Sequence, residues 1–335
     1  MSWRPILGHE RIVSQFAVAW RRSRLGHAYC FIGESGVGKH SFAVELAKTL
    51  LCERLGDSFE ACDVCDSCRL VPVGTHPDLF QVARPADKLE FPIDVIRDEL
   101  LPSMAMKPAR GGRKIAIVDD ADDLNTEAAN CFLKTLEEPP PGSLLILVGG
   151  TNVERQLPTI LSRCQVARFA PLPPDAVRKV LTGHGIADPA RQQRLLQLAG
   201  GSPGRALALD DDEIWAFRQH LLDVLARPTL DPAQEAAGWM AFIGNAGKEA
   251  SLHRQRANFV FRILLAILQS SLRLMQQPPA SPIGEEVSYA RIADRLGERK
   301  LLAWIERALQ ADIQVDRRVQ LVLVVEAYLD AICRA

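Results

Sequence analysis

The stretch Ala28–Lys39, AYCFIGESGVGK, decides the fold of this chain. Its first five residues form a short apolar run that predicts a buried β-strand, and the pattern G-x-x-x-x-G-K follows directly. Such a loop lets backbone N–H groups surround phosphate oxygens, while its lysine reaches the β- and γ-phosphates. The candidate nucleotide-binding residues are therefore Gly33, Gly36, Gly38 and Lys39. A plain Gly-rich turn is the alternative interpretation.

A helix is expected behind this loop, because Phe42, Leu46 and Leu50 recur every four residues. The residue after Lys39 is His40, whereas a loop that binds Mg²⁺ has Ser or Thr at that position. Mg²⁺ prefers oxygen ligands in octahedral geometry, so an imidazole is a poor substitute. We therefore expect ATP to bind weakly or not at all, and magnesium-assisted hydrolysis to be lost.

Three further apolar runs alternate with helical patterns in the first half of the chain. The runs are Asp78–Ala83, Lys114–Asp119 and Leu144–Val148, and the helical stripes are Ile93–Leu100 and Ala128–Leu136. Alternating strands and helices predict a mostly parallel sheet that is covered on both faces and binds ligands at the carboxyl ends of its strands. The expected fold class is an α/β P-loop NTPase domain.

The run Lys114–Asp119 ends in an acidic sequence. A carboxylate at the end of such a strand holds Mg²⁺ in P-loop enzymes, which makes Asp119 the candidate Walker B residue. Hydrolysing proteins have a Glu next, whereas Asp120 is one methylene shorter. A misplacement of about 1 Å can cost on the order of 10²-fold in rate. An acidic loop that faces solvent is the alternative interpretation.

The second half is expected to be helical after a Pro-rich linker at Pro171–Pro174. The predicted helices are Pro174–Gly183, Ala190–Leu198, Pro203–Leu209, Glu213–Ala226, Pro232–Gly244, Lys248–Gln276 and Val315–Cys333, with a Pro-rich break at Gln277–Gly284. We expect three domains: an α/β core at 1–169, a small helical lid at 170–209 and a helical C-terminal domain at 210–335.

Four cysteines follow the first helix with the spacing Cys52-x9-Cys62-x2-Cys65-x2-Cys68. Four thiolates suit a closed, tetrahedral structural zinc site, so we expect Zn²⁺ in a module at about residues 52–68. An iron–sulfur cluster is an alternative, because C-x2-C-x2-C also begins the bacterial ferredoxin pattern. That pattern continues with a Cys followed by Pro, which this sequence does not have. Free thiols are the remaining alternative.

Composition excludes several classes of protein. The 335 residues carry 40 Lys and Arg against 41 Asp and Glu, whereas a free-standing nucleic-acid binder has a basic excess. The longest apolar stretches, Asn258–Leu268 and Val319–Val325, are about half of a membrane span. The N-terminus has no apolar signal-peptide core. We therefore expect a cytoplasmic protein that does not enter the membrane.

Two basic features have both a structural and a functional interpretation. Lys107, Arg110, Arg113 and Lys114 form a basic cluster that either faces DNA or lies in a solvated loop. Arg163 follows a short predicted helix, and a cation at a helix C-terminus is stabilised by the helix dipole alone.

Six motifs, taken in order and spacing, resemble one family. They are the Gly-rich loop, the four-cysteine insertion, Thr75–Asp78 (THPD), the acidic strand end, Ala129–Pro140 (ANCFLKTLEEPP) and Ser162–Cys164 (SRC). Together they are similar to the clamp-loader subunits of bacterial DNA polymerase III, which are AAA+ proteins. The likeness runs from Trp3 to about Arg205. The helical remainder fits the collar domain of that family only by length and class.

The resemblance implies roles for single residues and a set of partners. Arg163 would be an arginine finger in trans for a neighbouring motor subunit, Arg205 would lie in the sensor 2 region, and Thr151 at sensor 1. The partners would be gamma or tau motor subunits and a delta subunit in a heteropentamer, the sliding clamp, and primed DNA through the complex. The chain would not be an enzyme alone, but part of a DNA-directed DNA polymerase (nucleotidyltransferase) holoenzyme and its clamp-loader ATPase.

His40 and Asp120 favour a member of this family that does not hydrolyse ATP, because motor subunits have Thr or Ser and then Glu at these positions. The alternative is an ATP-hydrolysing motor subunit of the gamma/tau type, whose turnover DNA and the clamp would stimulate. A zinc-dependent nucleic-acid enzyme is disfavoured, since four Cys ligands leave no open coordination position.

Overall fold

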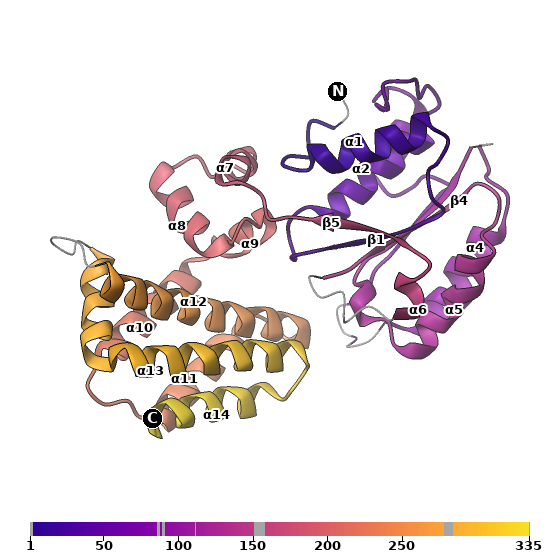
Figure 1. Ribbon diagram of the computed structural model, residues 1–335. Helices are drawn as coiled ribbons and strands as arrows, with labels where there is room; N and C mark the ends of the chain where they lie inside the picture. The colour runs from indigo at the N-terminus through magenta and orange to yellow at the C-terminus, as the bar shows by residue number, and fades with distance from the viewer. Residues whose placement is uncertain are drawn as a thin grey trace. The chain divides into compact units, whose positions relative to one another are not determined.

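A computed structural model describes residues 3–85, 88, 91–110, 112–150, 158–277 and 284–334. The chain divides into two compact units, Met1–Leu207 and Ala208–Ala335 (Figure 1). The first unit contains the sheet and the candidate sites, and the described residues of the second unit form helices and their connections.

A five-stranded sheet forms the centre of the first unit. Its strands are β1 (Ala28–Gly33), β2 (Leu79–Val82), β3 (Lys114–Val118), β4 (Ser143–Val148) and β5 (Gln165–Phe169), in the spatial order β2-β3-β4-β1-β5. All neighbouring strands are parallel, so their carboxyl ends meet at one edge. The parallel sheet predicted from the apolar runs is confirmed.

Strand β5 is the one that the sequence patterns did not predict. It pairs with β1 at the edge of the sheet, where Gly33 lies opposite Phe169. Most of its side chains are exposed or half-buried, so it lacks the continuous apolar run of the central strands. Phe169 is the buried exception, and its ring packs against Phe31 and Phe42.

Helices cover both faces of this sheet (Figure 1). They are α1 (Glu10–Arg21), α2 (Lys39–Leu51), α3 (Asp66–Leu70), α4 (Leu101–Ala105), α5 (Thr126–Glu137) and α6 (Pro158–Leu161), with a π-helix at Val95–Leu100 and a 3₁₀ turn at Ala121–Asp123. On the aromatic face, the Phe16 ring of α1 lies 4.7 Å from that of Tyr29, and the Phe42 ring of α2 lies 5.7 Å from that of Phe31. On the opposite face, α4 and α5 pack against smaller aliphatic side chains.

Three short helices end the first unit: α7 (Pro174–Gly183), α8 (Pro189–Ala199) and α9 (Pro203–Ala208). Asp188 caps α8 by accepting a hydrogen bond from the N–H of Arg191. Gly200 and Gly201 have positive φ and turn the chain from α8 into α9. The expected lid therefore belongs to the same compact unit as the sheet.

The second unit consists of α10 (Asp212–Ala226), α11 (Pro232–Gly244), α12 (Ala250–Gln276), α13 (Glu285–Asp316) and α14 (Leu321–Arg334). Its core contains the rings of Trp239, Phe261 and Tyr328, which contact one another. The buried Arg218 of α10 pairs with Glu285 at the start of α13. These contacts hold the unit together as a helical bundle.

Helix α12 is long and apolar enough to cross a membrane by length and composition, with a mean hydropathy of 1.3 over its 18-residue window. Within the described structure 44% of that window is buried, and α12 packs against α10, α11 and α13. A core helix of a globular bundle passes the same test.

The prediction of one helix at Val315–Cys333 was wrong, and α13 was not predicted. Residues between Asp316 and Leu321 leave the helical conformation, with Arg318 at a φ of 64°. Within α13, Gly297 also departs from helical geometry, with a φ of 68° and a ψ of 166°. This kink and the polar residues beside it interrupt the apolar periodicity on which a sequence prediction depends.

Candidate functional site

The Gly-rich loop lies at the carboxyl end of β1 and leads into α2, as the sequence predicted. Gly36 and Gly38 have φ angles of 76° and 99°, a backbone conformation that favours glycine. Lys39 turns back onto its own loop, because its Nζ donates hydrogen bonds to the carbonyl oxygens of Gly33 and Glu34, both at 2.6 Å. Burial lowers the pKa of Lys39, and nearby carboxylates oppose that shift. The lysine is thus satisfied by the loop itself.

The start of α9 rests directly on this loop. The N–H of Gly204 donates to the carbonyl oxygen of Gly36 at 2.9 Å, and the hydroxyl of Ser202 donates to the carbonyl oxygen of Ser35 at 2.8 Å. A β-carbon at Gly36 would lie 2.6 Å from Ser202 Oγ, and one at Gly204 would lie 2.8 Å from the α-carbon of Gly36. Glycine at both positions allows the two backbones to approach this closely.

Arg205, the predicted sensor 2 residue, is also directed to this loop. Its Nη2 donates to Glu34 Oε2 at 2.7 Å, and its Nη1 donates to the carbonyl oxygen of Ala199 at 3.0 Å. The Arg205 side chain is only 9% exposed, so it is largely desolvated beside Glu34. A bound phosphate would have to compete with this carboxylate for the guanidinium.

His40 contacts the predicted Walker B residue. His40 Nδ1 lies 2.9 Å from Asp119 Oδ2, with the two side chains 48% and 31% exposed. The hydrogen bond to Asp119 raises the pKa of His40 above its ordinary value. Burial opposes ionisation of Asp119, yet the hydrogen bond from His40 keeps the pKa of that carboxyl below its ordinary value. Both shifts favour an imidazolium–carboxylate pair.

Of the acidic residues that follow, Asp122 and Asp123 are half-buried, whereas Asp120 is exposed. Asp120 adopts a left-handed backbone conformation, and partial desolvation followed by the charge of Asp119 raises its pKa. Asp122 accepts a hydrogen bond from the N–H of Gly150, and Asp123 pairs with Arg84. The interpretation as a loop that only faces solvent is therefore wrong. Thr151, the predicted sensor 1 residue, lies outside the described residues.

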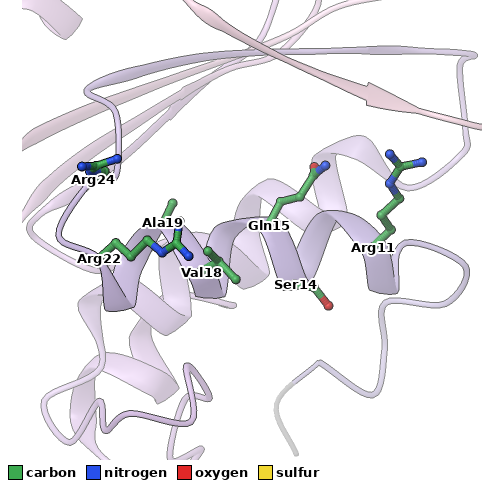
Figure 2. A pocket seen from close by; sticks show the side chains of 7 residues that line it. All are labelled: Arg11, Ser14, Gln15, Val18, Ala19, Arg22 and Arg24. Carbon is green, nitrogen blue, oxygen red and sulfur yellow. The ribbon is translucent and has the colours of Figure 1, made fainter.

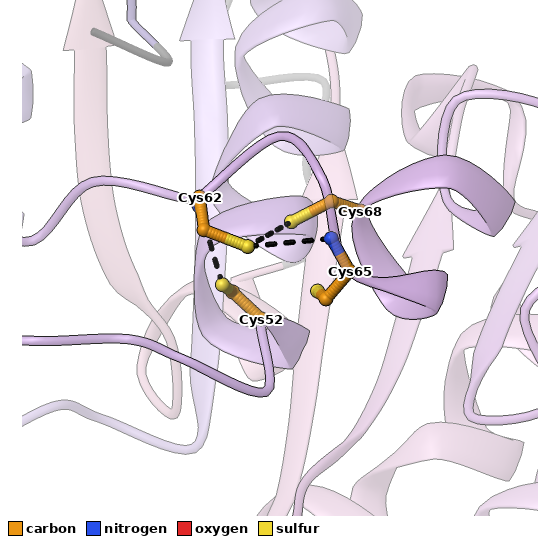
Figure 3. A group of neighbouring side chains, drawn as sticks. All are labelled: Cys52, Cys62, Cys65 and Cys68. Atoms are coloured by element: carbon orange, nitrogen blue, oxygen red, sulfur yellow. Dashed lines mark hydrogen bonds between the residues drawn. The ribbon is translucent and has the colours of Figure 1, made fainter.

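The four predicted metal ligands are brought together (Figure 3). The sulfur atoms of Cys52, Cys62, Cys65 and Cys68 all lie within 4.8 Å of one another, and those of Cys62 and Cys68 are 3.9 Å apart. A tetrahedral ion with metal–sulfur bonds of about 2.3 Å needs sulfurs about 3.8 Å apart. The spacing thus fits a single tetrahedral ion such as zinc.

Backbone N–H groups point at these sulfurs. Cys52 Sγ accepts from the N–H of Cys62, and Cys62 Sγ accepts from the N–H of Cys65 (Figure 3). Cys52 Sγ also accepts from the N–H of Arg54. Backbone donors, first that of Val64, lower the pKa of the Cys62 thiol to about 6. Burial raises the pKa of Cys68. N–H donors stabilise thiolates, which are the form that binds a metal ion.

The THPD motif links this module to the sheet. His76 Nδ1 accepts from the N–H of Asp78 at 3.0 Å, so the other ring nitrogen carries the proton and donates to Ser67 Oγ, also at 3.0 Å. Burial lowers the pKa of His76, which keeps the ring neutral. Ser67 in turn donates to Glu53 at 2.9 Å. The buried His76 therefore fixes α3 of the cysteine module against the start of β2.

The predicted basic cluster is largely engaged within the chain. Arg110 pairs with Glu53 at 2.7 Å, and the buried Lys114 lies 3.8 Å from Asp78. The Arg113 guanidinium lies 5.5 Å from the centre of the Trp20 ring. Of the four cluster residues, Lys107 alone is exposed without a side-chain partner among the described residues. The cluster is thus mainly structural, and neither of the two interpretations offered by the sequence describes it fully.

Arg163 lies just after α6 and reaches the end of α5. Its Nε donates to Glu137 Oε1 at 2.9 Å, and its Nη2 donates to the same oxygen. Its Nη1 donates to the carbonyl oxygen of Thr159 at 3.0 Å and to Ser162 Oγ at 3.2 Å. The interpretation of Arg163 as a cation stabilised by the helix dipole alone therefore describes only part of its environment.

A pocket of about 470 Å³ lies on the outer face of α1 (Figure 2). It is lined by Arg11, Ser14, Gln15, Val18, Ala19, Arg22 and Arg24. None of these residues belongs to the predicted sites. The pocket opens widely to solvent, so it is a surface depression and not an enclosed cavity.

Sequence reasoning missed Glu34 and Glu137, the carboxylates that hold Arg205 and Arg163. Glu34 lies inside the Gly-rich loop at a position that the motif leaves open. Glu137 belongs to the motif ANCFLKTLEEPP, which supported the resemblance but received no role. The motif that contains Glu137 was therefore recognised in the sequence. That this motif contacts the SRC motif is seen only in the folded structure.

Comparison with known proteins agrees with this arrangement. A family model described as DNA polymerase III, delta subunit, matches residues 8–173. The DNA polymerase III subunit delta' of Escherichia coli is 30% identical over 253 residues, which cover 76% of this chain and 74% of that protein. The chain belongs to the family of DNA polymerase III clamp-loader subunits.

Delta' and tau subunits in this clamp-loader family match the chain to a similar degree. The delta' subunit of Pseudomonas aeruginosa is 35% identical over 204 residues, 60% of this chain and 61% of that protein. The tau subunit of Escherichia coli is 36% identical over 223 residues, 63% of this chain but 34% of that protein. Two of the three alignments thus span less than two thirds of the relative.

Among solved structures, a gamma-subunit-related protein of Thermotoga maritima has a TM-score of 0.41 and 16% identity, covering 96% of this chain and 98% of that chain. A likeness of this size carries no conclusion about function.

Proposed function

We propose that the chain is the delta' subunit of a DNA polymerase III clamp loader and does not itself hydrolyse ATP. The observation that carries the proposal is the pair between His40 and Asp119 at 2.9 Å. In a hydrolysing P-loop protein, the equivalent hydroxyl and carboxylate hold Mg²⁺. Here an imidazole takes the hydroxyl's position and uses the carboxylate as its own partner, so Mg²⁺ would have to break the pair to bind.

The contacts of the Gly-rich loop also support weak nucleotide binding. Lys39 is hydrogen-bonded to its own loop, and α9 donates Gly204 N–H and Ser202 Oγ to that loop. A nucleotide that used Gly33, Gly36, Gly38 and Lys39 would have to replace the internal bonds of the lysine. Lys39 would exchange these internal hydrogen bonds for hydrogen bonds to phosphate. The net gain in binding free energy is therefore smaller than for a lysine without internal partners.

We propose that Arg163 acts in trans on the ATP of a neighbouring motor subunit. Its side chain is 33% exposed at the end of α6, so it is open to a partner. An arginine contributes to phosphoryl transfer by neutralising charge that develops on the transferred phosphate. A chain that cannot hydrolyse ATP can still supply this group to its neighbour.

In this proposal α7–α9 form the lid at 170–209, and the helices at 210–335 form a collar that joins the subunits. The partners are gamma or tau and delta subunits in a heteropentamer, the sliding clamp, and primed DNA through the complex. The four-cysteine module holds Zn²⁺ as a structural ion, and the assembly works in the cytoplasm. The catalytic activities are those of the DNA-directed DNA polymerase holoenzyme and its clamp-loader ATPase.

Reconstitution tests this function. The purified chain is combined with the gamma, delta and clamp proteins of the same bacterium and primed DNA, and ATP turnover is measured with the chain present, omitted or alone. We expect turnover that requires the chain, and none by the chain alone. Hydrolysis by the isolated chain that clamp and DNA stimulate would instead identify it as a gamma/tau-type motor subunit, which the identity to tau keeps as the second candidate.

A further inference from the structure

Most of the donors of Arg163 are already used inside the chain. A guanidinium has five N–H donors in a planar fork. Nε and Nη2 each donate one to Glu137, and Nη1 donates one to Thr159 and one to Ser162. Four of the five donors therefore have acceptors among the described residues, which leaves one for a new ligand.

The edge of the guanidinium that Glu137 occupies is suited to phosphate. Arginine binds carboxylates and phosphates through two parallel N–H groups, and the Nε/Nη2 edge offers such a pair. Because Glu137 occupies both donors of this edge, a phosphate oxygen cannot use it until the carboxylate leaves. The two anions are competitors for one edge of Arg163.

The fold holds Glu137 in place for this contact. It is the last residue of α5, whose start is capped by Asn125 and whose residues Phe132 and Leu136 are buried against the sheet. Helices α5 and α6 pack against each other, so Glu137 at the end of α5 and Arg163, two residues after α6, are held close together. The side chains are 33% and 52% exposed, and exposed pairs contribute little net stability. Such a pair is easily exchanged.

We infer that Glu137 is an internal counter-ion that restrains Arg163 until the triphosphate of a neighbouring subunit displaces it. This inference rests on the proposed role of Arg163 in trans. A triphosphate carries more negative charge than one carboxylate and competes favourably when the neighbour holds ATP. When the neighbouring site is empty, Arg163 returns to Glu137. Glu137 is thus a positioning residue that acts only through Arg163.

The restraint is tested first on the isolated chain. Phenylglyoxal, which reacts with free guanidinium groups, is applied to the wild type, Glu137→Gln and Glu138→Gln, and the adduct at Arg163 is followed by mass spectrometry. Glu138 is the matched control, because it is the adjacent exposed glutamate and makes no ion pair with the described residues. We expect several-fold faster modification in Glu137→Gln and the wild-type rate in Glu138→Gln. Equal rates in all three proteins overturn the inference.

The second test uses the reconstituted loader. We expect Glu137→Gln to raise ATP turnover several-fold in the absence of clamp and DNA, Glu138→Gln to leave it unchanged, and Arg163→Ala combined with Glu137→Gln to match Arg163→Ala alone. A fall in turnover with Glu137→Gln overturns the inference, because the carboxylate would then present the arginine and not restrain it. If Arg163→Ala itself changes nothing, the proposed role of Arg163 in trans fails, whereas the phenylglyoxal result still decides whether Glu137 restrains Arg163.

Discussion

His40 Nδ1 and Asp119 Oδ2 are 2.9 Å apart, at the two positions from which a P-loop ATPase holds its magnesium ion. The pair joins the first residues of α2 to the end of β3. In the proposed function, this internal contact takes the place of the cation that a motor subunit would bind here.

This pair predicts a measurable titration. Because the folded pKa of His40 is raised, its stabilisation is complete below the ordinary value of about 6.5 and is lost as the pH rises through the raised value. Because the pKa of Asp119 is lowered, its contribution is present above about 3.9 and is lost as the pH falls through the lowered value. The ion pair should therefore persist between these two limits.

NMR titration of the His40 ring checks this expectation. Asp119→Asn should return the pKa of His40 toward its ordinary value, whereas Asp98→Asn, which alters a carboxylate paired with Arg97, should leave it raised. An unchanged pKa of His40 in Asp119→Asn would show that Asp119 does not hold the ring.

Because the Gly-rich loop lies against α9, adding a methyl group at Gly36 should destabilise the protein. Gly36→Ala would force a non-glycine residue into a φ of 76° and place its β-carbon 2.6 Å from Ser202 Oγ. We expect a loss of about 1–3 kcal/mol in the free energy of unfolding, which chemical denaturation measures. Gly183→Ala is the control, because nothing lies within 4 Å of its β-carbon and its φ is not in the strained region. Equal stability of both variants would mean that α9 leaves the loop in solution.

The cysteine module predicts bound zinc in the purified protein. Elemental analysis should find about one zinc ion per chain, since four thiolates complete one tetrahedral site. Cys62→Ser should lose the ion and lower the melting temperature, while Cys131→Ser, outside the cluster, should keep it. Chelation of the wild type should reproduce the effect of Cys62→Ser. Iron with visible absorbance in place of zinc would contradict the assignment.

Replacement of the buried Asp78 should strongly lower the stability of the fold. It accepts from the N–H groups of Ala109 and Arg110 at 2.7 and 3.0 Å and lies beside the buried Lys114. Asp78→Asn removes the counter-charge of this lysine, which typically costs about 3–5 kcal/mol when both groups are buried. Thermal unfolding should show this loss, and the exposed Asp57→Asn should unfold like the wild type. A small effect would mean that Lys114 reaches solvent without its partner.

The sequence predicted the residue types at the site better than their contacts. The Gly-rich pattern identifies Lys39 because its spacing relative to the glycines is fixed by local geometry. That Lys39 bonds back to Gly33 and Glu34, and that Arg205 reaches Glu34, depends on how α9 folds onto the loop. Contacts between segments far apart in the chain leave no local pattern.

The secondary structure was likewise predicted where it leaves a local pattern in the sequence and missed where it does not. Central strands such as β3 are buried on both faces and read as apolar runs, whereas the edge strand β5 is largely exposed and does not. The helices α10 and α11 were predicted within a few residues of their ends, whereas α13, in which Gly297 breaks the helical geometry, was missed. The positive φ of Arg318 breaks the single helix that the sequence predicted at Val315–Cys333.

The most direct test of the account replaces Arg163 in the reconstituted loader. Arg163→Ala should leave assembly intact and sharply lower the ATP turnover that clamp and DNA stimulate, because an arginine finger contributes about 10³–10⁵-fold at the site it serves. Arg97→Ala, which removes another arginine held by exposed carboxylates, should assemble and turn over ATP like the wild type. Wild-type turnover and clamp loading with Arg163→Ala would contradict the central claim that this chain completes its neighbour's site.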